Sequence, residues 1–262
     1  MEILSNKKDE GAASPSFVIT DIKQAVRAEN RVNIFINDKF DFSLDIAQVV
    51  DLKLKKGQVL TEKELKDCRH ASEFGKLYQR TLEYVLSRPH SIKETRDHLV
   101  QNRKKRELTN LQAARNRERI KNETKEERTS RKALAEKFGT RLKTKELPLF
   151  TDDDIEKVIA RLIAKGYLDD EKFVRFYIEN KNVKKGISLK KIRQDLAQKG
   201  VSQNLIEQIL AESPRDESEE IKKIIMRKRK KYDDEKLIMY LVRQGFDYQQ
   251  SKDLVRETGS QN

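Results

Sequence analysis

The amino-acid sequence predicts a mainly helical protein made of tandem three-helix repeats in a curved array, with a small N-terminal β unit and a charged helical insertion. Alternation with a period of two, which is typical of strands, occurs only near the N-terminus. Farther along, a pattern of apolar residues returns after about 45 residues. In this return, Ile192, Leu196 and Val201 correspond to Leu237, Leu241 and Phe246. Units of this size cannot bury an apolar face alone, so successive copies are expected to stack on one another.

The N-terminal part predicts a β-hairpin. Residues 1–16 show no periodic pattern and are expected to be a disordered lead-in, whereas residues 17–70 are expected to form a small β-containing unit. In "RVNIFINDKFDFSL", two alternating runs flank Asn37 and Asp38, which both tolerate the positive φ of a tight turn. The segment "FVITDIKQAV" can add a third strand. One face of the hairpin is expected to carry Val32, Ile34, Ile36, Phe40, Phe42 and Leu44.

Local signals complete this unit with helices. A short helix is expected near Ile46–Asp51, followed by a turn at Gly57. Thr61 and Glu64 have the spacing of a capping box, so a helix is expected to begin there. From about Phe74 onward, helix signals replace strand signals.

Three repeats are predicted in the remainder, at residues 71–166, 167–212 and 213–262, with a short tail at the end. The helices of the last two repeats are expected at 169–183, 188–199, 202–212, 217–231, 233–244 and 247–258. Gly200 and Gly245 lie where a helix should end in a left-handed residue, so both are expected to have positive φ.

The first repeat is interrupted by an insertion at residues 101–147. The expected Lys-Gly stop, which the second repeat has at Lys199-Gly200, is missing where its second helix should end. The insertion holds 16 Lys or Arg and seven Asp or Glu, a net charge of +9 out of +13 for the chain. One or two exposed helices are expected. Two interpretations stay open: a solvated charged helix, or an arm that binds polyanions and folds only on its partner.

Residues for enzymatic chemistry are sparse. The nine glycines form no phosphate-binding loop, and one cysteine with three histidines gives no zinc spacing. His90 and His98 are expected to be exposed. The acidic clusters could hold magnesium in a nuclease, but each has a simpler role at a helix start. No enzyme, metal or cofactor is therefore predicted from the clusters Asp152–Asp154, Asp169–Asp170 and Asp233–Asp234.

The single cysteine and the absence of a long apolar run indicate a cytoplasmic protein. Cys68 has no partner for an internal disulfide and suits a reducing compartment. Its neighbours Lys66, Arg69 and His70 would permit a reactive thiol, but an inert cysteine at a helix end is the favoured interpretation. No apolar run approaches the ~20 residues of a membrane span, and no secretion signal is apparent.

Basic residues interleaved with aromatic ones are the candidate contact sites. The positive net charge favours polyanion binding over mere solubility. The nearby aromatic residues Tyr167, Phe173, Phe176 and Tyr177 recur at helical spacing and are expected to be mostly core. The run of five cations before Tyr232 can equally be a solvated helix end. The candidates are Lys184, Lys185, Lys190, Lys191, Arg193, Arg227, Lys228, Arg229, Lys230 and Lys231.

Several segments together resemble the RecX family of bacterial regulatory proteins. They are "SRPHSIKETRDHL", "KGYLDDEKFVRFYI" and "KKGISLKKIRQDLAQKGV", and the resemblance extends over residues 74–100 and 148–258, with a weaker match in the hairpin region. It implies tandem three-helix repeats and modulation, usually inhibition, of the RecA recombinase by binding in the groove of its filament on DNA. It implies no catalytic residues. The insertion departs from the family pattern.

The leading hypothesis is a cytoplasmic, monomeric regulator that binds RecA filaments and limits their growth or activity. One alternative is a general nucleic-acid-binding repeat protein, with weaker, electrostatic DNA contacts through residues 101–147. The other is a metal-dependent nuclease that uses the aspartate clusters. Dependence of binding on RecA separates the first two, and magnesium-dependent cleavage would identify the third.

Overall fold

A computed structural model describes residues 16–26, 28–138, 144, 146–213 and 215–259. Nearly all of the predicted lead-in at 1–16 lies outside these residues. Internal contacts divide the chain into two compact units, Met1–Arg80 and Thr81–Asn262. No helix within the described residues is long and apolar enough to cross a membrane.

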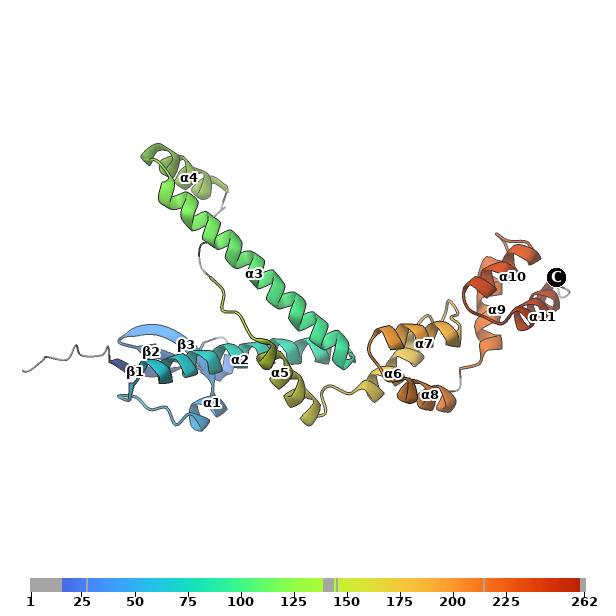
Figure 1. Cartoon of the computed structure of the whole chain (residues 1–262), viewed down its shortest axis with the longest axis horizontal. Coiled ribbons are helices and arrows are strands. Elements are labelled where there is room, and N and C mark those ends of the chain that lie inside the picture. The colour runs from blue at the N-terminus through green and yellow to red at the C-terminus, as the bar shows by residue number, and fades with distance from the viewer. Residues whose placement is uncertain (1–15, 27, 139–143, 145, 214, 260–262) are drawn as a thin grey trace, which may run out of the picture. The chain divides into compact units, whose positions relative to one another are not determined.

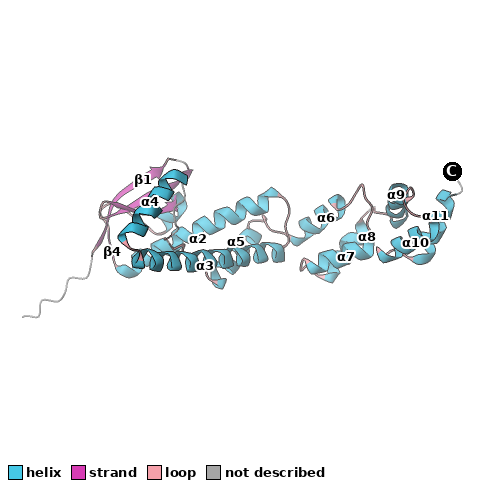
Figure 2. Ribbon diagram, turned by 90° about the horizontal axis from the view of Figure 1, so that it is seen from above, coloured by secondary structure: helices cyan, strands magenta, loops and turns pink. Residues whose placement is uncertain are grey.

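The N-terminal unit contains an antiparallel sheet of four strands in the order β3-β2-β1-β4 (Figure 2). The expected third strand is therefore present, and a short fourth strand joins it. The strands are β1 (Phe17–Ala25), β2 (Ala28–Ile36), β3 (Lys39–Asp45) and β4 (Val59–Leu60).

The predicted hairpin turn between β2 and β3 is confirmed. Asn37 and Asp38 have φ values of 48° and 65°, as a two-residue turn with left-handed residues at both positions requires. The Asn37 side chain also accepts a hydrogen bond from the Val18 backbone N–H at 3.1 Å, which ties the turn to β1.

Phe40 departs from the predicted alternation. Phe42 and Leu44 are buried as expected, but Phe40 is 57% exposed. The pairing changes register between Ile34 and Phe35, so that Phe42 lies opposite Ile34 while Phe40 lies opposite Phe35. Because neighbouring residues of a strand point to opposite faces, this bulge transfers Phe40 to the outer face.

Two helices pack on the sheet, α1 (Ile46–Asp51) and the 26-residue α2 (Glu62–Ser87). The predicted capping box opens α2, since the Thr61 N–H donates to the Glu64 carboxylate at 2.8 Å and the Glu64 N–H donates to Thr61 Oγ1 at 3.2 Å. No proline occurs within α2, and the next one along the chain is Pro89. The helix therefore runs through the predicted boundary between residues 70 and 71, and the contacts divide after Arg80 instead.

The core of this unit lies between the sheet and α2. Ile19, Ile34 and Leu44 from the strands pack in one cluster with Leu65 and Cys68 from the helix. Cys68 thus lies inside α2, not at a helix end. Burial, together with nearby acidic residues, raises the pKa of its thiol, so this cysteine is suited to packing and not to reactivity.

The second and third repeats have the predicted three helices each, which Figure 1 labels α6 to α8 and α9 to α11. Each repeat builds its own core, and the residue pairs separated by 45 positions are buried at equivalent places, as for Ile192 and Leu237 or Leu196 and Leu241. The helices are α6 (Asp170–Asn180), α7 (Leu189–Gln198), α8 (Gln203–Glu212), α9 (Glu217–Lys228), α10 (Asp234–Arg243) and α11 (Tyr248–Gly259).

The first repeat differs from the expectation of an interrupted copy. Its second helix, α3 (Ile92–Asn122), does not stop near residue 100 but continues into the insertion for 31 residues in all. No glycine or proline occurs within it, so nothing in the chain ends the helix. A second insertion helix, α4 (Lys125–Phe138), follows, and α5 (Asp152–Ala164) is the third helix of the repeat. The insertion therefore contains helical structure, as predicted.

The chain returns from the insertion along α3. We call residues 146–151 the return segment. The Asn110 side chain donates to the Leu147 carbonyl at 2.9 Å and accepts from the Leu147 N–H at 2.7 Å, while Arg106 donates to the Pro148 carbonyl at 2.7 Å. These bonds replace the backbone partners that an extended segment lacks, so the base of the insertion is held in place.

His90 is not exposed, contrary to the prediction. It is only 4% exposed, and its ring and that of His98 each lie 3.9 Å from the ring of Tyr84 between centroids. The corner before α3 turns His90 inward, where its Nδ1 lies 2.7 Å from the Arg88 carbonyl oxygen. Burial lowers the pKa of both histidines.

We expect the free energy of unfolding to decrease as the pH falls below about 6.5. A histidine with a lowered folded-state pKa is protonated first in the unfolded chain, so acid favours unfolding from the unfolded pKa downward. Thermal denaturation at about pH 7.5 and about pH 5.5 would measure this. Replacing His90 and His98 with Gln should flatten the dependence. An equal slope in the unchanged and the substituted protein would contradict the expectation.

Candidate interaction surface of the helical repeats

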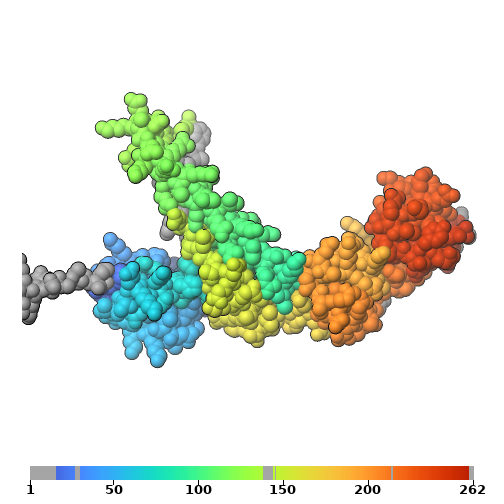
Figure 3. Space-filling view, in the orientation of Figure 1, coloured from blue at the N-terminus to red at the C-terminus, as the bar shows by residue number. Residues whose placement is uncertain are grey.

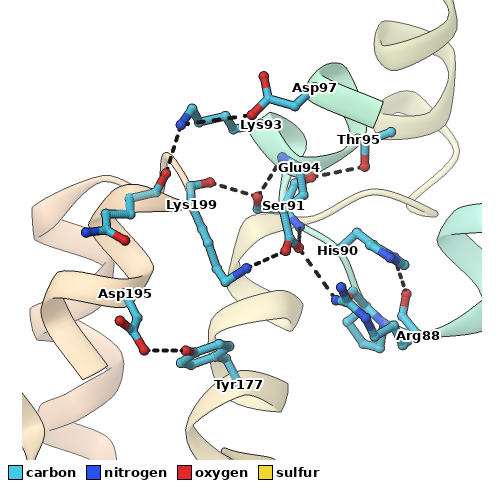
Figure 4. Close-up of polar contacts among 12 residues, drawn as sticks. Arg88, His90, Ser91, Lys93, Glu94, Thr95, Asp97, Tyr177, Asp195 and Lys199 are labelled. Atoms are coloured by element: carbon cyan, nitrogen blue, oxygen red, sulfur yellow. Dashed lines mark hydrogen bonds and ion pairs between the residues drawn. The ribbon is translucent and has the colours of Figure 1, made fainter. Parts of the chain in front are cut away.

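Successive repeats are joined by polar contacts. Side chains at the start of the second helix of one repeat bind carbonyl groups at the end of the second helix of the following repeat. Ser91 caps α3 by accepting from the Glu94 N–H at 3.0 Å, and its hydroxyl donates to the Lys199 carbonyl at 2.7 Å (Figure 4). Lys93 Nζ donates to the Gln198 carbonyl at 2.8 Å. The last carbonyls of α7 lack partners within their own helix, so the preceding repeat satisfies them.

The same junction occurs again between the second and third repeats. The Ser188 hydroxyl, which caps α7, donates to the Gln244 carbonyl at 2.7 Å. Both serines are fully buried. The same serine contact therefore recurs at both junctions between repeats, together with the fold of each repeat.

The two glycine stops are part of these junctions. Gly200 and Gly245 have φ values of +81° and +91°, which confirms the predicted left-handed ends. A Cβ on Gly200 would lie 2.6 Å from Cβ of Lys93, and one on Gly245 would lie 3.0 Å from Oγ of Ser188. Glycine therefore serves both the turn and the close approach of the preceding repeat.

Alanine at Ser91 is expected to lower the free energy of unfolding by about 1–2 kcal/mol. The change removes the cap of α3 and leaves the part-buried Lys199 carbonyl without the hydroxyl donor. Chemical denaturation would measure the loss. Ser202→Ala is the matched control, because Ser202 begins α8 without a side-chain cap. Equal stability of the two variants would show that the junction contributes little.

An open cleft of about 420 Å³ lies at the first junction. The Tyr177 hydroxyl donates to Asp195 at 2.8 Å, and the Nζ atoms of Lys181 and Lys199 lie 5.3 and 5.9 Å from the centre of the Tyr177 ring. Burial and the Asp195 contact raise the pKa of Tyr177. Burial disfavours the charged form of Glu94, but its contact with Lys199 lowers its pKa overall. The charges of the cleft are thus largely matched among themselves.

The five basic candidates of the second repeat divide into two groups. Lys191 pairs with Asp195 at 3.2 Å and Arg193 with Glu207 at 2.9 Å, so these two charges support the repeat itself. The other three are exposed and form no ion pair with any residue that the structure describes. They lie in the loop before α7 and on its first turn: Lys184, Lys185 and Lys190.

The basic run of the third repeat is divided in the same way. Arg227 donates to the Lys185 carbonyl at 3.0 Å, and Arg229 pairs with Asp234 at 3.1 Å. Lys228 lies over the ring of Tyr240 at 5.4 Å. The helix α9 ends at Lys228, so the run is a helix end followed by a turn. The exposed members of the run are Arg227, Lys230 and Lys231.

The acidic clusters lie at helix starts. Asp154 forms a capping box with Thr151, Asp169 accepts from two N–H groups of α6, and Asp233 accepts from the Lys236 N–H at 2.9 Å. In the part of the chain that is described, no three His, Cys, Asp or Glu side chains are placed to share a metal ion.

Two of the four aromatic residues near the cations are core. Phe173 and Tyr177 are buried, whereas Phe176 is half-buried and Tyr167 is exposed. The residues that sequence reasoning missed are those of the junctions, above all Ser91 and Ser188 with Lys93. The correspondence of the two serines was a detectable signal, but only the structure shows which carbonyl each one reaches.

Comparison with known proteins agrees with this architecture. The model of the regulatory protein RecX N-terminal domain matches residues 17–61, and that of the second RecX three-helix domain matches residues 169–210. A regulatory protein RecX of Bacillus licheniformis is 25% identical over 252 residues, covering 93% of this chain and 78% of that protein. One of Listeria monocytogenes is 29% identical over 261 residues, covering 88% and 93%.

A crystal structure of a regulatory protein RecX has the same fold, with a TM-score of 0.55 and 21% identity over 90% of this chain and 99% of that one. Three-helix repeats that follow a small antiparallel sheet in the sequence, joined by recurring serine contacts, define a class of helical-repeat protein. Within that class, the chain belongs to the RecX family of regulatory proteins.

Proposed function

We propose that the chain binds RecA filaments on DNA and limits their extension or activity. Membership of the RecX family, with the match to its second three-helix domain, carries this proposal. The relatives are named regulatory proteins. We propose that this chain is also a regulator, and that it acts as a monomer by binding, without a reaction of its own. The helix-start roles of its aspartates support that part of the proposal.

The contact surface that we propose is the exposed basic group of the second repeat. Lys184, Lys185 and Lys190 project from a loop and a helix start whose position is held by the core of the repeat. The junctions hold neighbouring repeats in register, so their charges form one surface and not independent tails. Complementary charge on such a surface increases association rate and specificity.

Nucleic-acid binding through the insertion is the second candidate function. Its net charge of +9 favours phosphate contacts. Some of this charge is internally paired, as for Arg131 with Glu123 at 2.8 Å. Four cations at the far end of α3 and on α4 are exposed and have no ion pair with the described residues: Lys121, Lys125, Arg128 and Lys132. These are the residues through which we propose weak, electrostatic DNA contacts.

The test is to mix the purified chain with RecA from the same organism on single-stranded DNA and to follow ATP hydrolysis. We expect hydrolysis to decrease as the chain is added, at concentrations where the chain alone binds little DNA. Binding that is the same with and without RecA would favour the general nucleic-acid function. Unchanged hydrolysis at saturating chain would contradict the leading proposal.

A further inference from the structure

The long helix α3 has two faces with different roles. Side chains of one face hold the return segment or the start of α5, at positions Arg103, Arg106, Asn110 and Arg117. With 3.6 residues per turn, these positions form one stripe along the helix. Their cations are therefore committed to contacts within the chain.

The other face combines two leucines with two cations. Lys104, Leu108, Leu111 and Arg115 follow one another at intervals of four, three and four residues, so they lie on one side of the helix, away from the return segment. We call these four residues the arm face. Leu108 is 66% exposed and Leu111 is 58% exposed. In Figure 3 much of the surface of α3 and α4, in green, is uncovered.

The residues of the arm face argue against two simpler explanations, a helix face that only contacts solvent and a face that binds a second copy of itself. A solvated helix gains nothing from leucines on its exposed side when polar helix formers would serve equally well. A second copy of the same face would bring Lys104 and Arg115 toward like charges, which opposes self-association. The face is therefore complementary to a surface that is both apolar and acidic.

The order of residues along the arm face distinguishes nucleic acid from protein. A helix that follows a phosphate backbone offers cations at successive turns. Here the two central positions are Leu108 and Leu111, and the cations flank them at either end. Phosphates over the centre would contact apolar side chains and lose hydration without a partner. An amphipathic helix satisfies all four residues, with apolar residues over the leucines and carboxylates near the cations.

We infer that the arm face is a docking site for an acidic amphipathic helix of a protein partner. The apolar anchors supply most of the affinity, as buried leucine contacts do in helix-in-groove complexes. The flanking cations select an acidic partner and increase its association rate. This site is separate from the cations Lys121, Lys125 and Arg128 of the proposed DNA contact, and it is independent of RecA binding.

The probe is a synthetic helical peptide of about 20 residues with leucines along one face and glutamates beside them. Its binding to the full chain would be followed by fluorescence anisotropy at several salt concentrations. We expect the double variant Leu108→Ser and Leu111→Ser to weaken binding about tenfold or more. We expect Lys104→Gln with Arg115→Gln to weaken it and to flatten its salt dependence.

Two controls keep the result specific. Leu86→Ser removes an equally exposed leucine, 63% accessible on α2, and should leave binding unchanged. A peptide with glutamines in place of the glutamates should bind more weakly, and circular dichroism should show equal helicity in all variants. The inference is overturned if the chain does not bind the acidic peptide or if the leucine variant binds it equally well. A loss of duplex DNA binding in the leucine variant, without loss of peptide binding, would identify a nucleic-acid surface instead.

Discussion

Alanine at Gly200 is expected to lower the free energy of unfolding by about 2–4 kcal/mol, which is a large part of the stability of an ordinary domain. Two costs add. The φ of +81° disfavours any side chain, and the new Cβ would lie 2.6 Å from Cβ and 2.7 Å from Cδ of Lys93. The first atom is fixed to the backbone of α3, so Lys93 cannot simply turn away. The junction between the first two repeats must therefore open or strain. Chemical denaturation would measure the loss.

Gly166 supplies the matched control, because it has a φ of +70° but nothing within 4 Å of a Cβ. Gly166→Ala should therefore cost only the conformational part, about 1 kcal/mol. If both variants lose the same stability, close packing at the junction contributes nothing. Unchanged stability of Gly200→Ala would mean that the repeat boundary is misplaced.

The helices of the last two repeats could be predicted because their ends are marked by local chemistry. Asp169 and Asp233 begin helices, and Gly200 and Gly245 end them, each through contacts within a few residues. The hairpin at Asn37 was equally local, since two left-handed residues define its turn.

The errors arose where distant residues decide the outcome. Phe40 is exposed because of a register shift in its pairing with β2, which alternation alone does not reveal. His90 is buried because Tyr84, on the preceding helix, provides a ring to stack on. The missing Lys-Gly stop near residue 100 predicts an interruption of the first repeat, whereas the helix continues because nothing ends it.

For the candidate surface, the sequence identifies the cations but does not show which of them are already paired with carboxylates of the chain. The pairing of Lys191 with Asp195 follows from a spacing of four residues on a helix and could have been expected. The pairing of Arg193 with Glu207 joins two helices and could not. Whether Lys184, Lys185 and Lys190 contact RecA stays a prediction.

Removing three charges from the second repeat is expected to raise the concentration of chain needed for half-inhibition of RecA about tenfold. The variant carries Gln at Lys184, Lys185 and Lys190. Lys191 and Arg193 are kept, because their charges are matched to carboxylates within the repeat. The three exposed cations are held on one surface, so their loss should reduce a shape-dependent interaction more than bare DNA binding. The measurements are ATP hydrolysis by RecA and binding of labelled DNA without RecA.

The matched variant removes three charges from the insertion, with Gln at Lys121, Lys125 and Arg128. It leaves the return segment and its contacts with α3 intact, which deletion of residues 101–147 would not. Here DNA affinity should fall, and the slope of log affinity against log salt should decrease by about 2–3, since each lost phosphate contact releases one counterion fewer. Inhibition of RecA should largely survive, because the surface of the second repeat is unchanged. The opposite pattern, with inhibition lost in this variant and retained in the repeat variant, would assign the inhibitory contact to the insertion.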